Sequence, residues 1–82
     1  MNVTGVKIYK IEGKDKLRAT ATITLEDAFM VHGLKIIEGE NGLFVVMPAV
    51  KKNGVFKDIA YPVTSEMRNT IVTAVLEEYN KQ

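Results

Sequence analysis

The sequence predicts an α+β fold, in which an antiparallel sheet of about five strands carries a C-terminal helix packed on it. Three patterns support this class. Residues 17–25 alternate apolar and polar side chains, as a strand with one buried face does. Asn-Gly pairs at 41–42 and 53–54 are signals of tight turns between antiparallel strands. Apolar side chains then recur at helical spacing in residues 65–80.

The length and composition indicate one small folded unit, and we expect a single domain over residues 1–82. At 82 residues a single core is only marginally sufficient, because small domains bury a smaller share of their surface. Hydrophobic residues make up 46% of the chain and charged residues 26%, which argues against disorder. The chain has no cysteine, no leader-like N-terminus and no apolar run approaching the roughly 20 residues of a membrane helix. We therefore expect a soluble, cytoplasmic protein.

The N-terminal half reads as three strands. Residues 3–11 carry the β-branched and aromatic side chains of a first strand, and a turn is expected at 13–15. The second strand, 17–25, should have one apolar face and one polar face of Arg and Thr. Residues 29–38 form the third strand, with Gly33 as a bulge where the alternation slips.

The run from Leu43 to Met47 is apolar at every position and stops at Pro48. This pattern is typical of a strand buried on both faces, so we expect it in the middle of the sheet. The tight turn at 39–42 pairs it with the third strand as a hairpin. The turn at 51–54 leads into a fifth strand, residues 55–61, which ends at the following proline.

A helix is expected after the fifth strand. Thr64 or Ser65 can cap its N-terminus, Glu66 suits its first turn, and it should end near Tyr79 or Asn80. Its apolar side chains span about 200° around the helix, twice the usual width. One sheet face would not cover this arc, and the apolar strand also needs cover on both sides, so we expect a homodimer. A loop folded over this surface is the alternative, but no long loop is available.

No residue pattern supports catalysis, and we expect that the protein is not an enzyme and needs no cofactor. His32 is the only histidine, and the sequence offers no cysteine or carboxylate cluster to complete a metal site. The acidic pairs at 26–27 and 77–78 are adjacent residues, whose side chains diverge on a strand or a helix and cannot act as a convergent acid and base.

Arg68 is a charged residue that helical spacing places inside the apolar arc, between Ile71 and Tyr79. Two interpretations are open. Its side chain could snorkel to the surface or pair with Asp58 on the preceding strand, which is the interpretation that we favour. It could instead contact a phosphate near the helix N-terminus, where the helix dipole favours anions.

The strongest local basic cluster comprises Lys51 and Lys52 at a predicted loop tip, with Lys57 across the hairpin. The net charge is only +1, so nucleic-acid binding would have to depend on local clustering of this kind. A dimer would carry the cluster twice. Two adjacent lysines also occur commonly on solubilising loops, which is the alternative interpretation.

Several segments together resemble the SpoVG family of bacterial septation and sporulation proteins. The most specific is Gly42-Leu43-Phe44-Val45-Val46-Met47-Pro48, and the likeness covers essentially the whole chain. The others are Met1–Thr4, Ala21–Leu25, Phe29–His32 and Asp58–Pro62, followed by Ser65 and Arg68.

The resemblance implies a dimeric, non-enzymatic protein that is linked to asymmetric septation and sporulation and acts as a nucleic-acid-binding regulator. The family's basic loop after the Met-Pro element falls on Lys51 and Lys52. This chain departs from the family pattern at Tyr61, where histidine is expected, and at 49–52, which reads Ala-Val-Lys-Lys where Ser-Lys-Arg is more usual. It also ends at Gln82, without the acidic tail that many members carry. Loss of an arginine removes a bidentate phosphate contact.

The sequence therefore predicts a regulator of septation or gene expression that binds DNA or RNA. Its expected phosphate contacts are Lys51, Lys52, Lys57 and Arg68. The competing prediction is a protein-interaction module of the division or sporulation machinery, acting through a strand edge or the wide apolar helix surface.

Overall fold

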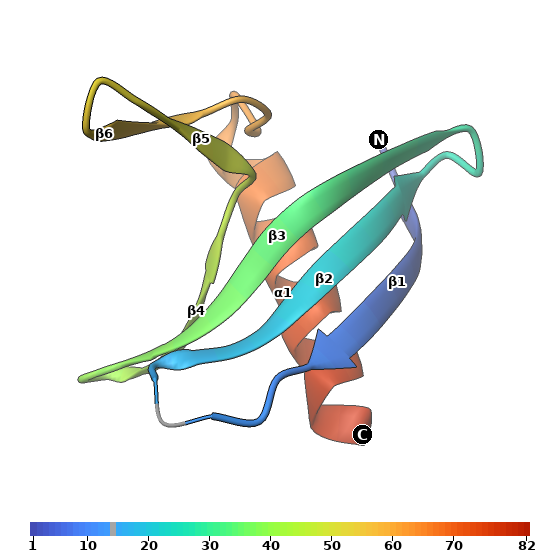
Figure 1. Ribbon diagram of the computed structural model, residues 1–82. Coiled ribbons are helices and arrows are strands. Elements are labelled where there is room, and N and C mark those ends of the chain that lie inside the picture. Colours follow the sequence, from blue (N-terminus) through green and yellow to red (C-terminus); the bar gives the residue numbers. More distant parts are fainter. Residues whose placement is uncertain (14) are drawn as a thin grey trace.

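A computed structural model describes residues 1–13 and 15–82 (Figure 1). Within this part of the chain, two antiparallel sheets precede a single helix. The predicted α+β class, with antiparallel strands and a C-terminal helix, is therefore confirmed, whereas a single sheet of five strands is wrong. A four-stranded sheet has the order β1-β2-β3-β4, and β5 and β6 form a separate hairpin. The elements are β1 (Val3–Lys10), β2 (Leu17–Leu25), β3 (Phe29–Gly39), β4 (Gly42–Val46), β5 (Ala49–Lys52), β6 (Val55–Asp58) and α1 (Ser65–Lys81).

The apolar strand β4 lies at the edge of the four-stranded sheet, and the expected position in the middle is wrong. Within residues 1–13 and 15–82 its only ladder is with β3, from Gly39↔Gly42 to Lys35↔Val46. Val45 is buried, whereas Phe44 on the other face is 47% exposed. The chain leaves the sheet at Pro48, which has no backbone N–H to extend a ladder, and the next two strands pair with each other instead. The middle positions belong to β2 and β3.

Glycine places the turns and the bulge where the sequence predicted them. The hairpin between β3 and β4 closes at Gly39↔Gly42. Asn53 and Gly54 both have positive φ, 51° and 80°, as a two-residue turn between twisted strands requires. The register between β2 and β3 shifts between Ala21 and Ile23, opposite Gly33, whose φ is 91°. The turn predicted at 13–15 includes Lys14, which lies outside the described residues.

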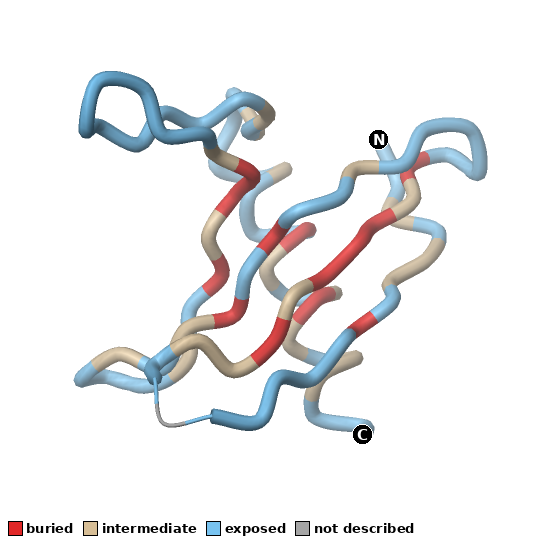
Figure 2. The backbone as a smooth tube through the Cα atoms, viewed as in Figure 1, coloured by how far each residue is buried: buried red, intermediate tan, exposed pale blue. Residues whose placement is uncertain are grey.

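The core lies between α1 and one face of the four-stranded sheet (Figure 2). Ala19, Ala21 and Ile23 of β2 point to the helix, which confirms the alternation predicted for that strand. The small alanines let the helix approach the sheet, and Ile71 and Val75 fill the space above them. Figure 2 shows the buried positions gathered along the inner strands and the helix.

Helix α1 begins as predicted. Thr64 is the N-cap, and its hydroxyl accepts a hydrogen bond of 3.1 Å from the backbone N–H of Met67. The predicted wide apolar arc is covered better than we expected, because Ile71 and Val75 are buried and its other members are half-buried. Large apolar side chains are exposed instead on the β5–β6 hairpin and in residues 59–63, and also on the four-stranded sheet, at Tyr9, Phe29, Met30 and Phe44. No helix in the described residues is long and apolar enough to cross a membrane.

Candidate nucleic-acid interface

The β5–β6 hairpin projects from the body of the protein (Figure 1) and carries the predicted basic cluster. Four residue pairs hold it together, from Ala49↔Asp58 to Lys52↔Val55. Every residue of β6 is exposed. At its base, the backbone N–H of Ile59 donates a 2.8 Å hydrogen bond to the carbonyl of Pro48. A projecting hairpin of this kind can reach a polyanion that the body of the protein does not touch.

The register of the hairpin divides the three lysines between its two faces. Lys51 lies opposite Phe56, and its Nζ is 5.8 Å from the centroid of that ring. Lys52 and Lys57 lie on the other face, because each is next in the chain to a residue of the Lys51–Phe56 pair and side chains alternate along a strand. The structure therefore brings Lys52 and Lys57 together on one face and places Lys51 on the other. All three side chains are exposed.

Arg68 lies on the first turns of α1, and its side chain is exposed. The ion pair with Asp58 that we favoured is wrong, because no carboxylate in the described residues lies within ion-pair distance of Arg68. Arg68 shares a side of the helix with Ile71 and Val75, three and seven residues further along, as helical spacing predicted. Those two residues are buried, whereas Arg68 and Asp58 are both exposed, so water solvates both charges and neither needs a partner. Arg68 therefore lies on a different element from the three lysines, which are on β5 and β6.

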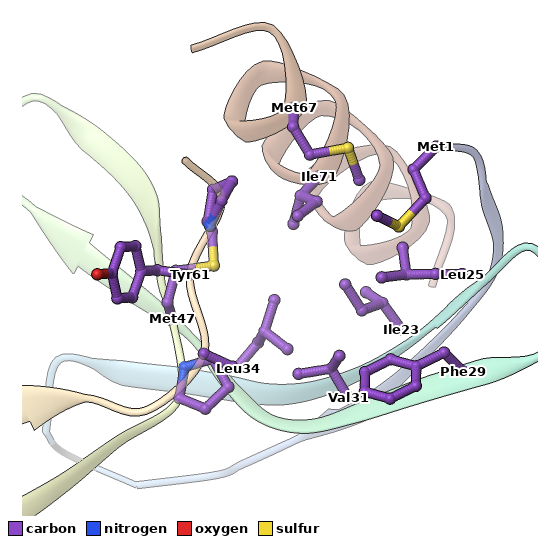
Figure 3. Close-up of a pocket in the computed structure, with 13 residues that line it drawn as sticks. Met1, Ile23, Leu25, Phe29, Val31, Leu34, Met47, Tyr61, Met67 and Ile71 are labelled. Carbon is purple, nitrogen blue, oxygen red and sulfur yellow. The ribbon is translucent and has the colours of Figure 1, made fainter. Parts of the chain in front are cut away.

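An apolar cavity of about 250 Å³ opens between the first turns of α1, the sheet and the segment that follows the hairpin (Figure 3). Met67 and Ile71 line it from the helix, and Leu34 and Met47 line it from the sheet side. Tyr61, where the family is expected to have histidine, also lines it and is 60% exposed. The cavity suits an apolar side chain, because its lining offers few polar groups.

His32 takes a structural role in the sheet. A hydrogen bond of 2.9 Å joins its Nδ1 to the hydroxyl of Thr22, the one buried polar residue in the described part of the chain. No group of three or more His, Cys, Asp or Glu side chains converges within the described residues.

Sequence reasoning did not identify the exposed aromatic side chains of the four-stranded sheet as candidates. Tyr9 and Phe44 lie on opposite edge strands and are 56% and 47% exposed. They are 35 residues apart in the chain by subtraction of their numbers, and no short motif joins them. Only the pairing of the strands could have placed them on a common surface.

The fold and the hairpin define a class, namely a small α+β protein whose antiparallel sheet carries one helix and a projecting basic hairpin. Comparison with known proteins identifies the family within that class. The SpoVG family profile matches residues 1–81, and the chain belongs to the SpoVG family.

Relatives with curated names cover almost the whole chain and carry the printed name "Putative septation protein SpoVG". The relative from Clostridium perfringens is 49% identical over 82 residues, which are 99% of this chain and 91% of the relative. The relative from Caldanaerobacter subterraneus is 44% identical over 82 residues, with 99% and 90% covered. The relative from Agathobacter rectalis is 43% identical over 83 residues, with 100% and 95% covered.

Proposed function

We propose that this protein is a cytoplasmic, non-enzymatic regulator of septation and sporulation that binds DNA or RNA through the β5–β6 hairpin. Lys51, Lys52 and Lys57 contact phosphates, and Arg68 adds a contact from the start of α1. The septation role is supported by family membership and by the printed names of the relatives. The observation that carries the binding site is the exposure of all three lysines on a hairpin that projects from the body.

Electrostatics allow this function despite a net charge of only +1. Contacts between lysines and phosphates depend on local charge, because a charge more than a Debye length away, about 10 Å at 0.1 M salt, is largely screened. The described residues of the hairpin, 49–58, hold three lysines and a single carboxylate, Asp58, at the end of β6. The hairpin is therefore locally basic, although the whole chain is nearly neutral.

The test is a binding titration of the full chain with DNA and RNA, as duplexes and as single strands, over a salt series. We expect the affinity of the parent protein to fall steeply with salt, because lysine–phosphate contacts release counterions. The variant Lys51→Ala/Lys52→Ala should reduce the logarithmic salt slope by about 2 per protomer bound. A matched control, Lys16→Ala/Lys81→Ala, removes the same charge outside the hairpin and should bind more tightly than the hairpin variant. An unchanged slope in the hairpin variant would refute the site.

We also propose that the protein acts as a homodimer. The support is the marginal size of the core and the amount of apolar surface left exposed, with Phe56, Ile59 and Val63 exposed by 66%, 64% and 89%. Sedimentation over a range of protein concentrations tests this directly. A monomer at all concentrations would refute it.

A protein-interaction module of the division or sporulation machinery is the second candidate. The observation that favours it is the apolar cavity beside Tyr61 and Met67, which could accept an apolar side chain of a partner. Recovery of a division protein in a pull-down after nuclease treatment would support this function. Loss of all partners on nuclease treatment would favour the nucleic-acid-binding function.

A further inference from the structure

The four-stranded sheet has one face that no other element of the described chain covers. In Figure 1 the helix lies behind the sheet, and the face toward the viewer is bare. Side chains on this face alternate with the core residues along each strand. We call it the open face and define it by Lys7 and Tyr9 of β1, Thr22 of β2, His32 and Lys35 of β3, and Phe44 of β4.

The strand register places these side chains on one surface. Tyr9 pairs with Thr20, Thr20 pairs with Lys35, and Lys35 pairs with Val46. This row crosses all four strands and ends at Val46. Phe44 lies two residues before Val46 on β4 and therefore on the same face. The outer strands are three strand spacings apart, or roughly 14 Å. The two exposed aromatic rings therefore flank the open face, with Lys35 between them.

The open face is basic and free of carboxylates. Lys7 and Lys35 are exposed, and none of the ten Asp and Glu residues of the chain occupies a position of this face on β1, β2, β3 or β4. Glu38, the nearest acid on β3, is paired with Arg18 at 3.2 Å. The charge that this surface presents is therefore complementary to an anion.

The centre of the face presents an oriented ring. The hydrogen bond between Thr22 and Nδ1 of His32 holds the imidazole, and the other ring nitrogen has no partner among the described residues. His32 is exposed. An imidazole can stack on a base or bond to its edge, as histidine does in proteins that recognise single-stranded RNA.

We propose that the open face binds single-stranded nucleic acid, with bases stacked on Tyr9 and Phe44 and phosphates held by Lys7 and Lys35. This inference rests on the proposed nucleic-acid-binding function and adds a second surface to it, on the body rather than the hairpin. Aromatic side chains on a bare antiparallel sheet bind bases only where the bases are unstacked, which excludes duplexes. A second copy fits the face poorly, because an isologous contact would bring together two faces that each carry Lys7 and Lys35 and no carboxylate.

The experiment uses the full chain with short fluorescently labelled single strands of RNA and DNA and with a blunt duplex of the same sequence. Tyr9→Leu and Phe44→Leu should each weaken single-strand binding at least about fivefold, the lower limit for loss of one stacked base, and leave duplex binding unchanged. Tyr9→Phe retains the ring and should retain the affinity. Phe29→Leu is the matched control, because Phe29 is also an exposed aromatic of this sheet but lines the cavity on the other face.

Two further measurements test the open face even if a leucine variant folds poorly. The chain has no tryptophan and three tyrosines, so stacking on Tyr9 should quench the tyrosine emission of the parent protein more than that of Tyr9→Phe. Lys35→Ala, which alters no ring, should weaken single-strand binding and lower its salt slope.

Each outcome decides the question. If only Lys51→Ala/Lys52→Ala weakens binding and the open-face variants do not, the inference is overturned and the hairpin function stands. If the open-face variants abolish single-strand binding and the hairpin variant has no effect on it, the inference stands and the hairpin site fails. If Tyr9→Leu changes self-association instead of binding, the open face is a contact between copies and the proposal is wrong.

Discussion

Replacement of Leu34 by alanine tests the core that positions both candidate surfaces. Leu34 lies on the inner strand β3 opposite Ala21, and its side chain is fully buried. β2 pairs with its backbone on one side and the ladder with β4 begins at the next residue, so the surroundings cannot readily close around the space that the mutation leaves. A Leu→Ala change at such a site costs about 2–5 kcal/mol, and we expect about 3 kcal/mol here. For a chain of this size that loss lowers Tm by roughly 12–24 °C.

The assay is urea unfolding followed by circular dichroism, at equal protein concentrations because self-association would stabilise the folded state. Leu43→Ala is the matched control, since Leu43 is only half-buried on the edge strand β4 and should cost about 1 kcal/mol. A loss below about 1 kcal/mol for Leu34→Ala, or equal losses for the two variants, would refute the packing that we describe.

Three smaller predictions concern the helix, the hairpin and the exposed arginine. Thr64→Ala removes the hydroxyl that caps Met67 and should cost about 1 kcal/mol in urea unfolding, whereas Thr64→Ser should retain the stability. Gly54→Ala places a Cβ at φ 80° and should cost about 1–2 kcal/mol. Because the hairpin is exposed, this cost should appear as faster hydrogen exchange of β5 and β6 at an unchanged Tm. Gly13→Ala is the control: its added Cβ has no atom within 4 Å, so the variant should change neither the exchange rate nor Tm. Arg68→Ala should change the free energy of unfolding by less than about 0.5 kcal/mol, because Arg68 has no ion pair among the described residues. A loss of several kcal/mol would contradict this.

Local signals in the chain predicted the local structure well. The Asn53-Gly54 pair predicted a hairpin because both residues tolerate positive φ, and both adopt it. Gly33 predicted the bulge of β3 for the same reason. The alternation of β2 predicted which of its faces is buried, and Thr64 predicted the start of α1. Each of these features is decided by residues close together in the chain.

Predictions that depended on how the elements are arranged in space failed or were incomplete. The apolar run of β4 indicated burial on both faces, but hydrophobicity alone does not decide whether a strand has neighbours on one side or on both. The chain leaves the sheet at Pro48, and β5 pairs with β6 instead of with β4. The pairing of Arg68 with Asp58 failed because it assumed a charge held inside the apolar arc, whereas both side chains are exposed. The division of Lys51 from Lys52 followed only from the register of the hairpin.

The sequence by itself therefore determined the α+β class, the turns, the helix and the basic hairpin, because these depend on local backbone preferences and on side-chain periodicity. Its motifs also determined membership of the SpoVG family, which the match over residues 1–81 shows. Only the tertiary structure decided which strands lie at the edges of the sheet and which side chains share its open face. Strand order sets both, and it brings Tyr9 and Phe44 to one surface from distant parts of the chain.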